Sequence, residues 1–107
     1  MQPRRIATAA AMLADPSRAA MVLALMDGRS RSAKKLALDA GVTAQTASAH
    51  LRKLVDAHML VWQGQGRSKY YRLAGSEVAH AVEALSGIDT QRVLPAAARE
   101  LRFARCC

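Results

Sequence analysis

The stretch Ser32–Ala57 constrains the fold of this chain more than any other part of it. It contains two helical patterns of apolar residues on either side of Gly41, whose open backbone suits the end of a helix. Ser32 and Thr43 stand where each helix would begin, and their hydroxyls can cap it. Two helices joined by so short a glycine-containing turn indicate a helix-turn-helix over residues 32–57. In that motif the second helix enters the major groove of DNA.

The second helix of the motif carries Ala47, Leu51 and Leu54 at helical spacing, which predicts a buried stripe. Because successive helical residues turn by about 100°, the opposite face is fixed as well. It holds side chains that can read or hold DNA: Gln45, Thr46, Ser48, Ala49, Arg52 and Lys53. Gln45 can form two hydrogen bonds with adenine, and Arg52 can bind guanine or a phosphate. Thr46 and Ser48 can reach bases or phosphates.

The composition fits one domain that binds a polyanion. A chain of 107 residues with 51% hydrophobic side chains can form one core. Lys and Arg number 16 against 8 acids, a net charge of +8, which favours a nucleic acid over a merely solubilising charge excess. We find no apolar run that could span a bilayer and no signal peptide, so we expect a cytoplasmic protein without a membrane partner.

A β-hairpin pattern follows the motif. Met59–Gln63 and Ser68–Leu73 are rich in aromatic and β-branched residues, and a glycine-containing turn at 64–67 separates them. Tyr71 should face inward, whereas Arg67 and Lys69 should project at the tip. A hairpin directly after a recognition helix is a wing, here residues 59–73, and its basic tip would lie along the phosphate backbone.

Helices are also predicted outside this region. Ile6–Ala14 is an Ala-rich helical pattern, and Asp15-Pro16 suits the start of the next helix. After a polar connection at 29–31 comes the central motif. Beyond the wing, Ser76 can cap a helix with Val78, Val82 and Leu85 on one face, and a last helix begins at Leu94. The predicted fold class is therefore mainly α (α+β), with five to six helices and one hairpin.

Three segments in this order resemble the ArsR/SmtB family of winged helix-turn-helix bacterial repressors. They are LADPSR at 13–18, ASAHLRKL at 47–54 and GRSKYYRL at 66–73. The resemblance implies a single domain over residues 1–107 and a homodimer whose interface is formed by outer helices, 4–14 and 76–107. It also implies a double-stranded DNA operator with two-fold symmetry, and release when a ligand binds.

Three residues allow two interpretations each. By periodicity His50 lies at the shoulder of the buried stripe, as a structural histidine would, whereas the resemblance favours a position near DNA. On the strength of the resemblance, His50 is predicted to be one of the residues that contact DNA. Lys34 and Lys35 in the first motif helix face either the DNA backbone or solvent.

A ligand site is harder to assign. The first motif helix contains no Cys or His, so the metal site that the family has there is absent. Glu77, His80 and Glu83 recur at helical spacing, but a solvated face explains them better than zinc. Cys106 and Cys107 form an adjacent pair whose soft thiolates suit trivalent arsenic or a thiophilic metal ion, or a redox switch. Alternatively these cysteines are incidental.

The leading interpretation is a homodimeric transcriptional repressor that a ligand releases from its operator. One alternative is a ligand-independent DNA-binding regulator, controlled by a partner or by a missing C-terminal segment. Another is a winged helix that binds an acidic protein. An enzyme is not expected, because the sequence has neither a phosphate-binding glycine loop nor a nucleophile with a partnered base.

Overall fold

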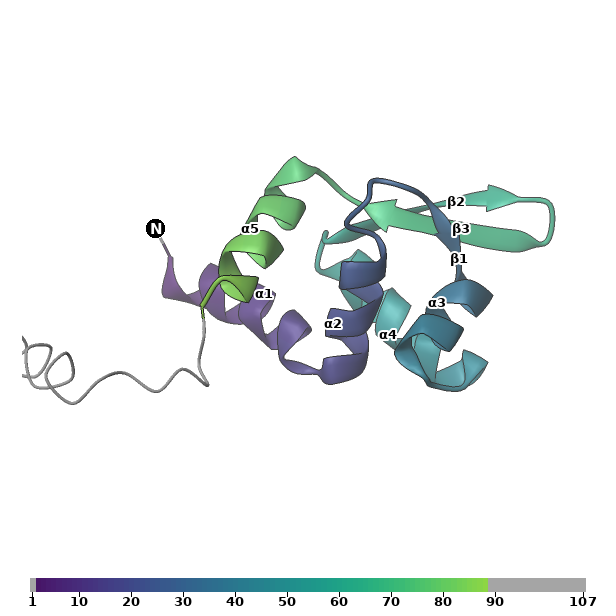
Figure 1. The fold of residues 1–107 in the computed structure, drawn as a ribbon, viewed down its shortest axis with the longest axis horizontal. Helices are drawn as coiled ribbons and strands as arrows, with labels where there is room; N and C mark the ends of the chain where they lie inside the picture. The colour runs from purple at the N-terminus through teal and green to yellow at the C-terminus, as the bar shows by residue number, and fades with distance from the viewer. Residues whose placement is uncertain (1, 89–107) are drawn as a thin grey trace, which may run out of the picture.

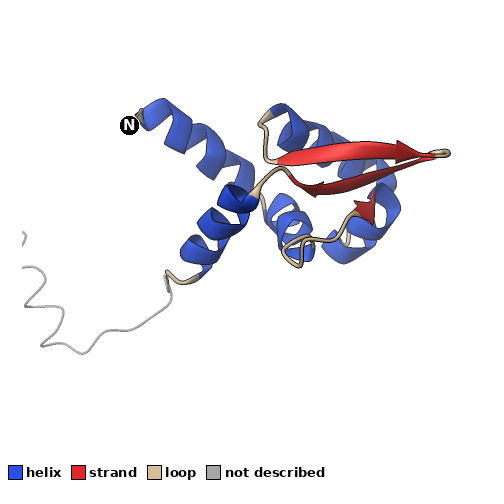
Figure 2. Ribbon diagram, turned by 90° about the horizontal axis from the view of Figure 1, so that it is seen from above, coloured by secondary structure: helices blue, strands red, loops and turns tan. Residues whose placement is uncertain are grey.

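The computed structural model describes residues 2–88, which form five helices and three strands. In chain order these are α1 (Pro3–Ala14), α2 (Pro16–Ala24), β1 (Arg31–Ser32), α3 (Ala33–Ala40), α4 (Ala44–Asp56), β2 (Leu60–Gln65), β3 (Ser68–Leu73) and α5 (Ser76–Ser86). The hairpin of β2 and β3 projects from one end, and α1 and α5 lie at the other (Figure 1). Figure 2 shows the same separation from above.

The helix-turn-helix forms as its capping residues predict. The Ser32 hydroxyl accepts a hydrogen bond from the Lys35 amide at 3.1 Å, which caps α3. Gly41 ends that helix in the left-handed conformation, with φ at 67°. The Thr43 hydroxyl then accepts from the Thr46 amide at 3.2 Å and caps α4. These bonds satisfy amides that the first turn of a helix leaves free, so local chemistry sets both helix starts.

The core lies between α2, α3, α4 and the root of the hairpin. Ala47, Leu51 and Leu54 are fully buried, as the predicted stripe requires. They pack with apolar side chains of the neighbouring elements: Met21, Val22, Leu25, Leu36 and Leu60. Burying a Leu side chain stabilises a fold by about 1.5–3 kcal/mol, so this cluster holds α4 firmly against the rest of the domain.

The sheet has one strand more than the sequence analysis predicted. Residues 29–31 were expected to form only a polar connection, yet Arg31 pairs with Tyr71 and Ser32 with Tyr70. This two-residue strand, β1, adds to the free edge of β3 and gives the order β1-β3-β2. The sequence of residues 31–32 has no β-forming pattern from which β1 could be predicted. The strand forms because the folded hairpin offers the free edge of β3 for pairing.

The turn of the hairpin is shorter than predicted. The strands continue to Gln65 and Ser68, which pair with each other, so Gly64 belongs to β2 and only Gly66-Arg67 turns. Gly66 takes up the positive φ of 63° that such a tight turn requires. Tyr71 is buried on the inner face, as expected.

The outer helices are less buried than the centre. Val78 and Val82 of α5 are buried, but Leu85, predicted on the same face, is 50% exposed, and α1 has no buried residue. Gly75, and not Ser76, is the N-cap of α5, and no side chain caps that end. The predicted helix from Leu94 lies outside the described residues.

None of the helices within residues 2–88 is alone long and apolar enough to span a membrane. Only α1 and α2 taken together pass such a test of length and composition, and an angle of 89° separates their axes. Asp15 makes this junction: its carboxylate accepts from the amides of Ser17 and Arg18 and caps α2, as predicted.

Candidate nucleic-acid interface

The outer side of α4 is a continuous exposed surface. All six residues predicted there are exposed, and we call them the recognition face: Gln45, Thr46, Ser48, Ala49, Arg52 and Lys53. The fully buried Leu51 and Leu54 hold the opposite side of the helix. The recognition face therefore points away from the core, with short polar groups towards its start and two cations towards its end.

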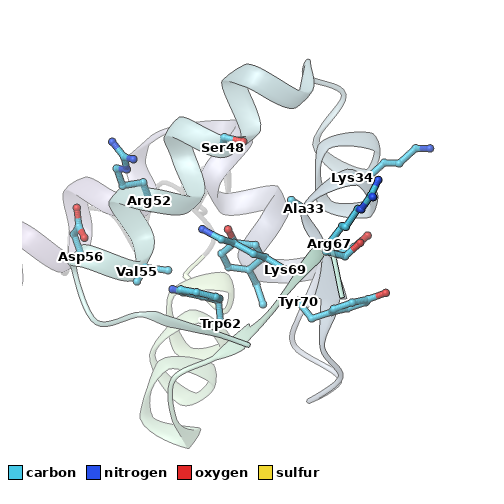
Figure 3. Close-up of a pocket in the computed structure, with 13 residues that line it drawn as sticks. Ala33, Lys34, Ser48, Arg52, Val55, Asp56, Trp62, Arg67, Lys69 and Tyr70 are labelled. Atoms are coloured by element: carbon cyan, nitrogen blue, oxygen red, sulfur yellow. The ribbon is translucent and has the colours of Figure 1, made fainter. Parts of the chain in front are cut away.

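A hollow of about 690 Å³ opens between α4, the hairpin and the start of α3. We call it the wing hollow. Figure 3 shows Ser48 and Arg52 of α4 on one side and Trp62 and Lys69 of the hairpin on the other. Four cationic side chains line it against one acid, and they come from three segments: Lys34, Arg52, Arg67 and Lys69, with Asp56 as the acid. Such a basic concavity suits a phosphate backbone.

Lys69 does not simply project from the hairpin tip, as the sequence analysis expected. Its Nζ lies 4.4 Å from the centre of the Trp62 ring, which places the ammonium over the indole. The opposite residue on β2 is Gly64, which adds no side chain beside the Trp62 ring. The cation–π contact holds the charge on the inner side of the hairpin, within the wing hollow.

The structure separates the two lysines of α3. Lys34 lines the wing hollow, whereas the ammonium of Lys35 lies 3.0 Å from the carboxylate of Asp39, one turn further along α3. Of the two alternatives left open by the sequence, Lys34 fits a role next to the DNA backbone and Lys35 fits a solvated surface pair.

His50 lies on the inner shoulder of α4, and its side chain is 15% exposed. Its Nδ1 lies 3.2 Å from Nη1 of the nearly buried Arg18, and its Nε2 lies 3.8 Å from Oδ1 of Asp15. Both partners belong to the start of α2. This geometry favours the structural reading of His50, and direct contact with DNA stays a prediction.

Comparisons with known proteins agree with this fold. The helix-turn-helix domain family matches residues 13–61. The chain is 40% identical over 107 residues to an uncharacterized HTH-type transcriptional regulator, YdfF, of Bacillus subtilis (strain 168). That alignment covers 95% of the chain but 47% of YdfF, so the chain spans about half the length of this relative.

Solved structures are also similar. The cadmium metal-sensor CMTR of Mycobacterium tuberculosis is 32% identical, with a TM-score of 0.62 over 84% of this chain and 97% of that one. The homodimeric winged helix-turn-helix DNA-binding domain Mb0332 of Mycobacterium bovis, a possible ArsR-family regulator, is 26% identical, with a TM-score of 0.71. That match covers 78% of this chain and 76% of the other. The chain belongs to the ArsR/SmtB type of winged helix-turn-helix domains.

Within this family the recognition face and the wing hollow occupy the two parts that define a winged helix. YdfF is described as a transcriptional regulator and Mb0332 as a DNA-binding domain, which agrees with the class of protein that the sequence predicts. Two residues of the site were not predicted from the sequence: Trp62, which is 49% exposed in the wing hollow, and Arg18. Alternation along β2 could have placed Trp62 on the same face as Tyr71. No local pattern indicates the contacts of Arg18.

Of the predicted ligand sites of this ArsR-type domain, only the one on α5 lies within the described residues. Across residues 2–88, no three His, Cys, Asp or Glu side chains come together in a way that could hold a metal ion, which includes Glu77, His80 and Glu83. Cys106 and Cys107 lie outside the described residues, so their role stays a prediction.

Proposed function

We propose that this domain binds operator DNA as a homodimer and represses transcription, with α4 in the major groove and the hairpin wing against the neighbouring backbone. The observation that carries the proposal is the continuity between the recognition face and the wing hollow. Arg52 belongs to both, so a duplex that meets α4 also meets the cations of the wing. The net charge of +8 supports a polyanionic partner.

The side chains divide into those that read bases and those that hold phosphates. Gln45 is exposed at the start of α4 and can recognise adenine, while the methyl group of Ala49 can contact that of thymine. Thr46 and Ser48 reach bases or phosphates, and Arg52 guanine or a phosphate. Arg67, Lys69 and Lys53 would hold phosphates, which adds affinity without sequence preference.

The end of the molecule away from the wing supports self-association. Large apolar side chains of α1, α2 and α5 stay exposed there, with Ile6 at 56%, Leu23 at 53% and Leu85 at 50%. A second hollow, of about 220 Å³, lies among Leu13, Leu23 and Leu85. Clustered exposed apolar groups mark interaction surfaces. A second copy placed here would supply a second α4 helix, and helix-turn-helix dimers bind half-sites about 34 Å apart, one turn of DNA.

The test begins with the chain itself. Duplexes selected from a random pool by the purified protein should share a two-fold symmetric sequence, which we call the selected duplex. Affinity for it should fall steeply with salt, because phosphate contacts release counterions. Recovery of only unrelated sequences, bound no more tightly than a scrambled duplex, would contradict operator recognition.

The wing is tested by a matched pair of arginines. Arg67 lines the wing hollow, whereas Arg72 stands on the outer face of β3, opposite in direction to Lys69 and Tyr71. Arg67→Ala should weaken binding to selected and scrambled duplexes alike and lower the salt slope by about one counterion. Arg72→Ala removes the same charge and should change neither. If the two variants weakened DNA binding equally, the wing would contribute only through the overall charge of the domain.

Release by a thiol-binding ligand is the finer part of the proposal, and it rests on Cys106 and Cys107. Phenylarsine oxide is a suitable probe: two thiols form two As–S bonds, and the oxygen leaves as water. One equivalent should release wild type but not Cys106→Ser from the selected duplex. Persistent binding of wild type would favour the alternative regulator that senses no ligand itself.

A cytoplasmic location follows from the proposed binding to bacterial DNA.

A further inference from the structure

Three helices meet at one buried guanidinium. Arg18, in the first turn of α2, is 9% exposed. Its Nε donates to the carbonyl of Met12 at 2.8 Å, and its Nη2 donates to that of Ala11 at 3.1 Å. These carbonyls belong to the last turn of α1, where no intrahelical partner exists. The remaining nitrogen, Nη1, points to His50 of α4 at 3.2 Å. One side chain therefore connects the outer helix α1 to the helix of the recognition face.

The donor chemistry of Arg18 assigns a role to each ring nitrogen of His50. A guanidinium can only donate, so Nδ1 of His50 must accept, and the ring is then neutral with its proton on Nε2. Nε2 faces the carboxylate of Asp15, 3.8 Å away. The backbone amide of Arg18 donates to that carboxylate and lowers the pKa of Asp15, so it stays ionised at neutral pH. The imidazole is held between a donor on one side and an anion on the other.

We propose that Arg18 is a positioning residue for operator binding: through neutral His50 it ties α4 to the junction of α1 and α2, and protonation of His50 releases the tie and weakens binding. This inference rests on the proposed function of the domain. It differs from a direct role of His50 at the DNA, because the ring faces α2 and lies on the inner shoulder of α4.

The charges around His50 support this switch. Protonation would place an N–H at Nδ1 against the guanidinium, which removes the hydrogen bond and opposes two cations. Asp15 would still attract the imidazolium, so the link that protonation breaks is the one that runs from α4 through Arg18 to the α1 carbonyls. On α3, Lys35 and Asp39 pair with each other, and Lys34 faces the wing hollow. β2 has no titratable side chain, and Arg52, Lys53 and Asp56 of α4 itself are exposed.

The direction of the pH effect separates this proposal from direct contact. A histidine that binds a phosphate gains a positive charge on acidification, so DNA binding becomes tighter. Release of the tie between Arg18 and His50 predicts weaker binding over the range in which histidines charge, about pH 8 to pH 5.5. The two readings therefore predict opposite signs.

The experiment measures affinity of the full chain for the selected duplex at both pH values and constant salt. Wild type should lose about three- to tenfold on acidification, the scale of one ordinary intramolecular hydrogen bond. His50→Asn keeps an acceptor near the position of Nδ1 but cannot charge, so its affinity should stay constant. His58→Gln and His80→Gln remove exposed histidines and should behave as wild type does. Tighter wild-type binding at low pH that His50→Asn abolishes would overturn the proposal.

Arg18→Lys tests the other partner. A lysine keeps the charge, but its single ammonium cannot bind both α1 carbonyls and His50 in the fixed geometry of a guanidinium. This variant should bind at pH 8 as weakly as wild type at pH 5.5, with no further loss on acidification. The double variant with His50→Asn should be no weaker than Arg18→Lys alone, because the two residues share one interaction. Additive losses would show that Arg18 and His50 act independently, and would overturn the tie between them.

A readout without DNA keeps this test independent of the proposed function. Proton–nitrogen NMR of the imidazoles should show His50 neutral at pH 8 with its proton on Nε2, and Arg18→Lys should change that pattern. A proton on Nδ1 would exclude the acceptor role and overturn the inference. If no selected duplex is obtained, the proposed function fails, while the NMR result still decides whether the tie exists.

Discussion

The two ends of this domain differ in how well their helices are capped and buried. At the wing end, α3 and α4 have capped starts, a turn with the required glycine and a stripe of fully buried side chains. At the other end, α1 has no buried residue, and α5 starts without a side-chain cap. The wing end is stabilised by its own chain, and its exposed surface is mainly polar and basic, with Leu38, Val61 and Trp62 as apolar exceptions. The outer helices leave apolar groups exposed, as a surface that awaits a partner does.

The largest effect should come from a pair of leucines at the two ends. Leu51→Ala removes a fully buried side chain of α4 and should lower the free energy of unfolding by about 2–5 kcal/mol, through lost burial and a cavity. Leu85→Ala on α5 removes one that is 50% exposed, so it should cost far less in dilute protein. Urea unfolding monitored by circular dichroism measures both. Equal losses of unfolding free energy would show that the outer helices are packed as tightly as the centre of the domain.

Self-association sharpens the same contrast. Leu85→Lys places a charge in the apolar surface of the outer helices and should weaken dimerisation by about thirtyfold or more, the scale of an interface hot spot. Leu38→Lys is the matched control, because Leu38 of α3 is 69% exposed at the wing end. Sedimentation equilibrium should show a dimer for the control. If Leu38→Lys gives monomers and Leu85→Lys does not, the dimer interface lies at the wing end and not at the outer helices.

A smaller effect tests how locally the wing end is determined. Thr43→Ala removes the cap of α4 and should cost about 1 kcal/mol of unfolding free energy. Thr43→Ser keeps a hydroxyl and should restore most of that loss. A cost no greater than that of an ordinary surface substitution would mean that packing alone sets the start of α4.

The smallest effect concerns acid stability at the junction of α1 and α2. Hydrogen bonds from backbone amides, that of Arg18 first, lower the pKa of Asp15 in the folded state. Its carboxylate therefore stabilises the fold above the unfolded pKa, and this stability is lost as the pH falls through the lowered value. Asp15→Asn can still cap α2 but does not titrate, so its unfolding midpoint should fall less on acidification than that of wild type. The pKa of Asp27 is lowered in the same way by Arg29, so part of the acid loss should persist.

The sequence predicts the features that depend on neighbours along the chain. Caps at Asp15, Ser32 and Thr43, the turn at Gly41 and the buried stripe of α4 all follow from residue type and helical period. Features that depend on distant residues were not predicted. The strand β1 needs the edge of β3, and Lys69 turns inward over Trp62, which lies across the hairpin.

The contact between Arg18 and His50 joins residues 32 positions apart. It depends on how α2 and α4 pack together, so no local sequence pattern predicts it. Periodicity placed His50 at the shoulder of α4 but could not name what it would meet there. The same limit applies to the site as a whole. Helical period identified the recognition face residue by residue, whereas the wing hollow exists only once α3, α4 and the hairpin have come together.

Base discrimination by Gln45 tests the central claim, that the exposed side of α4 reads the major groove. We predict that Gln45→Ala lowers the ratio of affinities for selected over scrambled duplex by about tenfold, the scale of one bidentate base contact. Affinity for the scrambled duplex should not change, because Gln45 holds no phosphate in this account. An unchanged ratio, with binding to both duplexes as in wild type, would contradict the placement of α4 in the groove.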